Sequence, residues 1–144
     1  TLMCGKIAAG KTTEAEKIAQ KGAVLLSCDE LMLTVFTSCL GSKHVETERR
    51  CLRYLFKMAQ RLNEKGIDSV IDAGFWTREE RTEAEVFFKT SGITFEWKKV
   101  EAPDEVRKER IKVRYELSQN GEFCERVFAP SPERAAQLDQ KFED

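Results

Sequence analysis

Short apolar runs alternate along the chain with longer segments in which apolar residues recur at helical spacing. The apolar runs, and one stretch of alternating apolar and polar residues, predict strands at residues 1–4, 23–27, 70–72 and 93–97. The segments with helical spacing predict helices at residues 13–21, 46–65, 77–90 and 103–118, and a last one from residue 131. Strands separated by helices indicate an α/β fold with a short, mainly parallel sheet flanked by helices.

Some of these elements are marked by more than their periodicity. The continuous apolar run at 23–27 is typical of a strand covered on both faces, whereas the alternation at 93–97 predicts a strand nearer a sheet edge. Thr77 opens a capping-box pattern and Ser131 precedes a proline, so both predict helix starts. Residues 31–42 are ambiguous, although their apolar positions are compatible with a short helix.

Residues 5–12 read Gly-Lys-Ile-Ala-Ala-Gly-Lys-Thr and fit the phosphate-binding loop G-x-x-x-x-G-K-[ST]. Gly5 and Gly10 allow the turn angles and the close contact that a triphosphate needs. Lys11 can bridge the β- and γ-phosphates, and the Thr12 hydroxyl can hold Mg²⁺. The loop lies between a predicted strand and a predicted helix, which is the context that the motif requires. The candidate nucleotide-binding residues are Gly5, Lys6, Ile7, Ala8, Ala9, Gly10, Lys11, Thr12 and Thr13.

Two carboxylates follow predicted strands, at the end of the sheet where parallel folds bind their ligands. Asp29 comes after the second strand, and Asp72 ends the third in the manner of a Walker B strand. Beside a triphosphate, one carboxylate can bind Mg²⁺ while the other orients and deprotonates an attacking hydroxyl. Either residue alone could equally be a cap or a turn residue. Together with the loop, the pair favours a functional site.

A cationic helix face supplies a further candidate group. Arg107, Arg110 and Arg114 are spaced so that they share one side of the predicted helix at 103–118. Arginine can stabilise the charge that develops during phosphoryl transfer. A solvated face paired with neighbouring glutamates is the alternative. Basic residues between 43 and 53 have the same alternative, which we favour there, and Phe75 is interpreted as core.

Composition limits the classes of function further. The chain has 144 residues and a net charge of −1, so we expect one domain and no broad basic surface for nucleic acid. No apolar stretch approaches the roughly 20 residues of a membrane span. Five cysteines without a C-x-x-C pair, and a single histidine, indicate free thiols in a reducing cytoplasm rather than a zinc site. Among them, Cys28 is interpreted as a buried, inert thiol.

Taken in order, these segments resemble the small P-loop kinases over nearly the whole chain. The resemblance rests on the loop at 5–12, Cys28-Asp29-Glu30, the run Asp72-Ala73-Gly74-Phe75-Trp76 followed by Arg78 and Arg81, and Arg110-x-x-x-Arg114. Within that group the chain is most similar to the AAA-domain type of ATP-binding kinases, which look related to zeta toxins, chloramphenicol phosphotransferase and polynucleotide 5′-kinase. One departure is the loop interior at 7–9, Ile-Ala-Ala, where the family usually has Pro-Gly-Ser.

The resemblance implies a three-layer P-loop NTPase fold in one domain, 1–144, with a short lid segment around 107–130. It implies ATP and Mg²⁺ as cofactors, a small-molecule hydroxyl as acceptor, Asp29 as general base, and Arg110 and Arg114 on the phosphates. It also makes Arg78 and Arg81 candidates for substrate binding. With Lys11 on the phosphates and Thr12 and Asp72 on Mg²⁺, the predicted activity is a cytoplasmic kinase. A polynucleotide 5′-hydroxyl kinase and a non-catalytic nucleotide-binding switch stay as alternatives.

Overall fold

The computed structural model describes residues 1–36, 40–122 and 127–144. Within these residues one parallel sheet has the strand order β2-β3-β1-β4, so the predicted α/β class is confirmed. The strands are β1 (Leu2–Cys4), β2 (Val24–Ser27), β3 (Ser69–Asp72) and β4 (Trp97–Lys99). The helices are α1 (Lys11–Ala19), α2 (Cys28–Phe36), the 3₁₀ turn η1 (Gly41–Lys43), α3 (His44–Asn63), α4 (Arg78–Thr90), α5 (Asp104–Gln119) and α6 (Pro132–Asp139).

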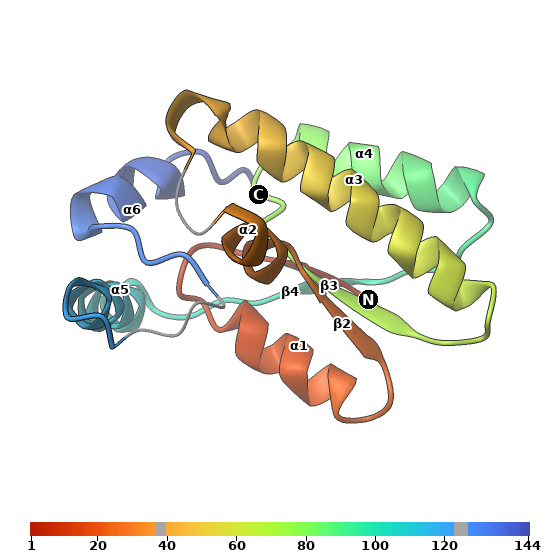
Figure 1. Cartoon of the computed structure of the whole chain (residues 1–144), viewed down its shortest axis with the longest axis horizontal. Coiled ribbons are helices and arrows are strands. Elements are labelled where there is room, and N and C mark those ends of the chain that lie inside the picture. The colour runs from red at the N-terminus through yellow and green to blue at the C-terminus, as the bar shows by residue number, and fades with distance from the viewer. Residues whose placement is uncertain (37–39, 123–126) are drawn as a thin grey trace.

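The elements form three layers (Figure 1). Helix α1 lies on one face of the sheet, while α3 lies on the other with α4 beside it. Successive strand residues point to opposite faces, so in β1 Met3 packs against the α1 side and Leu2 against the α3 side. Helices α5 and α6 pack together near the loop that joins β1 to α1. This arrangement places the loop at the carboxyl ends of the strands.

The larger half of the core lies between the sheet and α3. The apolar stripe predicted for that helix buries Leu55, Phe56 and Ala59. The Phe56 ring lies 6.2 Å from that of Phe75 and 5.3 Å from that of Phe88, distances at which aromatic pairs attract one another beyond simple burial. Phe75 is 2% exposed, which confirms its assignment to the core.

Helix starts follow the predicted caps. Thr77 and the helix residue three positions later form a complete capping box at α4, and the Ser131 hydroxyl accepts the Arg134 N–H at the start of α6. In the described part of the chain, no helix combines the length and the apolar character that a bilayer crossing requires.

Strand β2 lies at a sheet edge, where Val24 is 37% exposed. Leu25 packs on the α1 side of the sheet and Leu26 on the α3 side, so the predicted cover on both faces is confirmed. Two other sequence predictions need correction. Strand β4 begins only at Trp97, because Ile93 and Phe95 precede it and pack against the core instead. The ambiguous segment at 31–42 contains a helix, but that helix already starts at Cys28, directly after β2, and residues 37–39 lie outside the described residues.

The β2–β3 pairing sets the positions of the two strand-end carboxylates. Ser27 pairs with Asp72 in the parallel ladder, and α2 begins at the next residue. The Ser27 hydroxyl accepts the N–H of Glu30, which anchors the first turn of α2 to the end of the strand. Asp29 therefore lies on a helix turn that follows the sheet without a linker.

Candidate functional site

The loop at 5–12 joins β1 to α1 and has the backbone of a phosphate cradle. Gly10 caps α1 at φ 106° without a side-chain cap, so the first N–H groups of the helix face the loop. Lys11 folds back over the loop, and its Nζ donates to the carbonyls of Gly5 at 2.9 Å and Lys6 at 2.8 Å. Burial lowers the pKa of Lys11, whereas the negative charges of Asp72 and Asp29 act to raise it. An anionic ligand could replace the two carbonyls as acceptors of its protons.

Gly5 is required by a close backbone approach. Its φ is 146°, and a Cβ placed on it would lie 2.3 Å from the Val100 carbonyl oxygen. That neighbour is backbone and belongs to the segment after β4, so it cannot move aside as a side chain would. The first glycine of the motif thus fits the loop against the sheet.

Ala8 occupies a left-handed backbone conformation, with φ 58°. This is the place at which related loops usually carry glycine, and a Cβ makes this conformation unfavourable by about 1–2 kcal/mol. The backbone angles at this position are therefore not the ordinary ones in which alanine is accommodated without strain. The loop keeps a strained residue at its centre.

We expect Ala8→Gly to raise the free energy of unfolding by about 0.5 kcal/mol, because relief of the strain exceeds the added flexibility of the unfolded chain. The neighbouring Ala9 is equally buried and has no positive φ, so Ala9→Gly should lower stability by about 0.5–1 kcal/mol. Urea unfolding of the two variants measures the difference. Equal destabilisation by both would contradict the strain at Ala8.

Thr12 and Asp72 form a hydroxyl–carboxylate pair between the first turn of α1 and the end of β3. Asp72 is 6% exposed. Burial raises its pKa, whereas a hydrogen bond from Thr12 and the charge of Lys11 act to lower it. Hard oxygen ligands of this kind are those that Mg²⁺ accepts together with phosphate and water. The residues present thus fit a magnesium ion bound beside a phosphate chain.

Asp29 lies next to this pair on the first turn of α2. Its Oδ2 accepts a hydrogen bond from the Phe128 N–H at 3.3 Å. Burial raises the pKa of Asp29, an effect that the Phe128 bond opposes and the charge of Asp72 reinforces. A carboxylate with a raised pKa is a better proton acceptor, which is the property expected of a general base.

The arginines of α5 divide into two roles. Arg114 is half-buried, and its guanidinium interacts with the charges of Asp29 and Asp72. Arg110 Nη1 donates to the Ala8 carbonyl at 3.1 Å, so this residue lies on the phosphate loop. Arg107 instead is buried in an ion-pair network with the carboxylates of Asp104 and Asp139. The three residues therefore do not act as one solvated face.

The two arginines after β3 have other neighbours. Arg78 bonds to the backbone of Asp144, and Arg81 donates to the carbonyls of Phe75, Trp76 and Glu143. These contacts lie along the C-terminal segment, and the structure does not place either guanidinium among Lys11, Asp29 and Asp72. Substrate binding by Arg78 and Arg81 stays a prediction.

The basic residues at the start of α3 are paired on the surface. Arg49 bonds to Glu79 and Glu83, and Arg53 also bonds to Glu83. The preferred interpretation of a solvated helix face is confirmed for these two residues. Cys28 is buried, as predicted, and burial raises its pKa, which favours the protonated thiol. Cys39 and Cys124 lie outside the described residues.

Glu48 is a candidate site residue that sequence reasoning missed. It lines a groove between α3 and the β3–α4 connection, together with Leu52, Phe56, Gly74 and Glu80. Burial raises its pKa to about 7, and the charge of Asp29 adds to the shift. The sequence did contain a sign of this burial. Residue 48 is a glutamate at a position that falls on the apolar stripe of the helix, in line with residues 52, 55, 56 and 59.

Protonation of Glu48 should make stability depend on pH. Its pKa is raised from 4.5 to about 7 in the folded chain, so its contribution to stability is full below about pH 4.5 and is lost as the pH rises through 7. Glu48→Gln mimics the protonated form, and its stability advantage over wild type should grow by about 2 kcal/mol between pH 5 and pH 8. Exposed Glu64→Gln is the matched control. The free energies of unfolding come from urea curves at both pH values. A stability difference between Glu48→Gln and wild type that is the same at pH 5 and pH 8 would refute the assignment.

The parallel sheet, the glycine-framed loop and the helix that follows it define a P-loop NTPase fold. A family model described as AAA domain matches residues 1–137, and the chain belongs to this family. The small P-loop kinase resemblance proposed from the sequence is thereby confirmed at the level of family and fold. Among curated proteins the sequence finds no match.

Solved structures of similar fold include proteins with several activities. APS kinase CysC of Mycobacterium tuberculosis, solved with AMPPNP and APS, has 20% identity and a TM-score of 0.62, over 98% of this chain and 96% of that one. Kti12 of Chaetomium thermophilum, solved with ADP-AlF3, has 17% identity and a TM-score of 0.71, over 99% and 79%. A chain of the Pnkp1/Rnl/Hen1 complex has 19% identity and a TM-score of 0.65 over 76% of this chain, which spans only 37% of that one. Identities this low establish a shared fold and nothing more specific.

Proposed function

We propose that the protein is an ATP-dependent phosphotransferase that moves the γ-phosphate to a hydroxyl group of a small-molecule acceptor. The observation that carries this proposal is Asp29. It is a half-buried carboxylate beside Lys11 and Arg114, and its Oδ2 accepts only a long 3.3 Å bond from Phe128 among the hydrogen bonds between described residues. A module that only binds nucleotide has no use for a second carboxylate at this position.

The remaining residues would divide the work of phosphoryl transfer. The loop amides and Lys11 would hold the β- and γ-phosphates, while Thr12 and Asp72 would hold Mg²⁺, which neutralises phosphate charge when bound. Asp29 would accept the proton of the attacking hydroxyl. Arg110 and Arg114 would stabilise the charge on the transferred group from the α5 side. Most of the rate enhancement would thus come from positioning and electrostatics.

We propose the groove lined by Glu48 as the acceptor site, because the charge of Asp29 acts on Glu48 and the groove also includes Ala73 and Gly74, which directly follow Asp72. A metabolite pool incubated with ATP and Mg²⁺, and analysed by mass for products gaining one phosphoryl group, tests the proposal. We expect a discrete product with wild type and none with Lys11→Met. ATP binding without any phosphorylated product would favour a nucleotide-binding switch instead.

An oligonucleotide acceptor is tested in the same assay. Phosphorylation of a 5′-hydroxyl oligonucleotide is measured at two salt concentrations. Attraction to the phosphate backbone weakens as salt rises, so the salt dependence separates that attraction from recognition of the hydroxyl group. The pairing of Arg49 and Arg53 with glutamates leaves them little excess positive charge to offer a phosphate backbone. We therefore expect the small-molecule pool to supply the substrate.

A further inference from the structure

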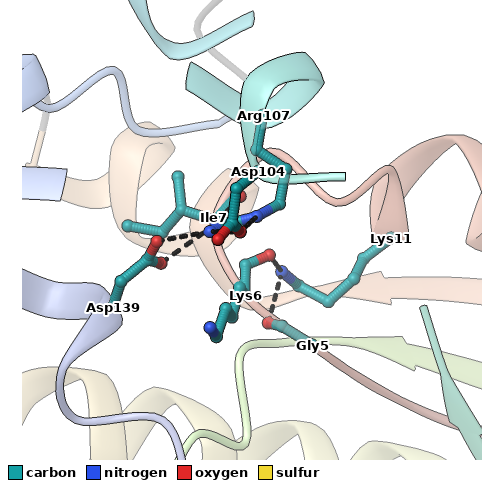
Figure 2. Close-up of polar contacts among 7 residues, drawn as sticks. All are labelled: Gly5, Lys6, Ile7, Lys11, Asp104, Arg107 and Asp139. Atoms are coloured by element: carbon teal, nitrogen blue, oxygen red, sulfur yellow. Dashed lines mark hydrogen bonds and ion pairs between the residues drawn. The ribbon is translucent and has the colours of Figure 1, made fainter. Parts of the chain in front are cut away.

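We propose that Arg107 is a positioning residue that holds the phosphate loop in its binding conformation and makes that conformation depend on Asp139 of α6. The inference rests on the proposed nucleotide site, because it concerns how the loop amides are aimed. Figure 2 shows the Arg107 guanidinium gathered with Asp104, Asp139 and the loop residue Ile7, with dashed contacts to Asp139. This contact joins three segments that are far apart in the sequence.

All five N–H donors of the Arg107 guanidinium are used. Nη1 donates to the Ile7 carbonyl at 3.0 Å and to Asp139 Oδ1 at 3.1 Å, and Nη2 donates to Asp139 Oδ2 at 2.6 Å. Nε and Nη2 share Asp104 Oδ1 at 3.3 and 2.8 Å. The Arg107 side chain is 5% exposed and that of Asp139 22%, whereas that of Asp104 is 67% exposed. Asp139 is therefore the partner that fixes the fork, and a lysine could not make the same set of bonds.

The bond to Ile7 decides which way the next amide points. In a planar trans peptide the carbonyl and the following N–H point in opposite directions. With the Ile7 carbonyl held by Arg107 of α5, the Ala8 N–H points away from that bond. The neighbouring Ala9 N–H donates to Lys6 O at 3.3 Å. Among the described residues, the Ala8 N–H meets no protein acceptor.

The contacts of Arg107 with Asp139 and the Ile7 carbonyl, here called the brace, matter because Ala8 does not prefer this conformation. Its φ of 58° is unfavourable for alanine, and the carbonyls on both sides of its Cα, those of Ile7 and Ala8, are held by Arg107 and Arg110 from one helix. Without the brace, Ala8 would relax and rotate an amide away from the phosphates. Glycine at the same position would retain the binding conformation with much less help.

Asp139→Asn tests this because simple electrostatics predicts the opposite sign. Removing a negative charge near an anionic ligand should strengthen binding slightly, and Glu133→Gln, on the exposed face of the same helix, measures that effect. We expect Asp139→Asn to weaken ATP binding in the presence of Mg²⁺ about tenfold, with Glu133→Gln within about twofold of wild type. Arg107→Lys, which keeps the charge and loses the fork, should also weaken binding.

The double variant distinguishes positioning from a general structural role. In an Ala8→Gly background, Asp139→Asn should weaken ATP binding by less than about threefold, because glycine removes the strain that the brace opposes. Titration calorimetry on each folded protein, with urea unfolding as the check on structure, gives these affinities. Wild-type affinity in Asp139→Asn and Arg107→Lys, or an equal loss in both backgrounds, would overturn the inference. A wild type that binds ATP yet transfers no phosphate would count against the proposed activity alone, and one that binds no ATP would count against both.

Discussion

Asp29→Asn should lower phosphate transfer about a thousandfold, the loss typical of removing a general base, while ATP affinity stays within about threefold of wild type. Asparagine keeps the shape of the side chain and can still meet the Phe128 N–H through its carbonyl oxygen. It cannot accept the proton of an attacking hydroxyl. The effect should therefore fall on turnover and leave donor binding nearly untouched.

The pH dependence of transfer adds a second readout for Asp29. Burial raises the pKa of its carboxyl, so the wild-type rate should fall as the pH drops through that raised value and the base becomes protonated. The residual rate of Asp29→Asn should lack this limb. Exposed Asp68→Asn provides the matched control and should transfer at the wild-type rate. Full turnover in Asp29→Asn would exclude the residue as the base.

Lys11→Met should weaken ATP binding by at least about a hundredfold, because two charge-assisted hydrogen bonds to phosphate are lost, each contributing about 1.5–3 kcal/mol. Folding should change little, within about 1 kcal/mol. The two loop carbonyls would lose a donor, but burial already disfavours the charge of Lys11, as its lowered pKa shows. Methionine preserves most of the side-chain volume.

Lys17→Met is the control for this second variant. Lys17 lies on the same helix, its side chain is 61% exposed, and it pairs with Glu14. The control should bind ATP as wild type does, and titration calorimetry compares the two directly. Equal affinities for Lys11→Met and Lys17→Met would show that the loop lysine does not bind phosphate.

Local patterns were sufficient for much of the fold. The capping box at Thr77 and the apolar stripe through Leu55 and Phe56 each depend on neighbours within a few residues, and both elements form as predicted. The rule that ligands bind at carboxyl strand ends also selected Asp29 and Asp72, which the structure brings together around Lys11. Residues whose role is set by local chemistry and strand order could thus be identified from the sequence.

Other features depend on contacts that no local pattern encodes. Strand order determines that β2 is an edge, and an apolar run cannot show which strands lie beside it. Arg107 has the same spacing as Arg110 and Arg114, yet it is buried because Asp139, 32 residues away, meets it. The unfavourable φ at Ala8 likewise follows from packing against α5 rather than from the preference of alanine.

The pairing of β2 with β3 sets the spacing between the two carboxylates of the candidate site. Ser27 is paired with Asp72, and Asp29 is two residues beyond Ser27 on a helix that starts at once. The separation between the proposed base and the proposed metal ligand is therefore set by strand register, and a one-residue slip would turn every side chain of the strand to the opposite face. Formation of the β2–β3 ladder therefore also brings the two carboxylates to the same end of the sheet.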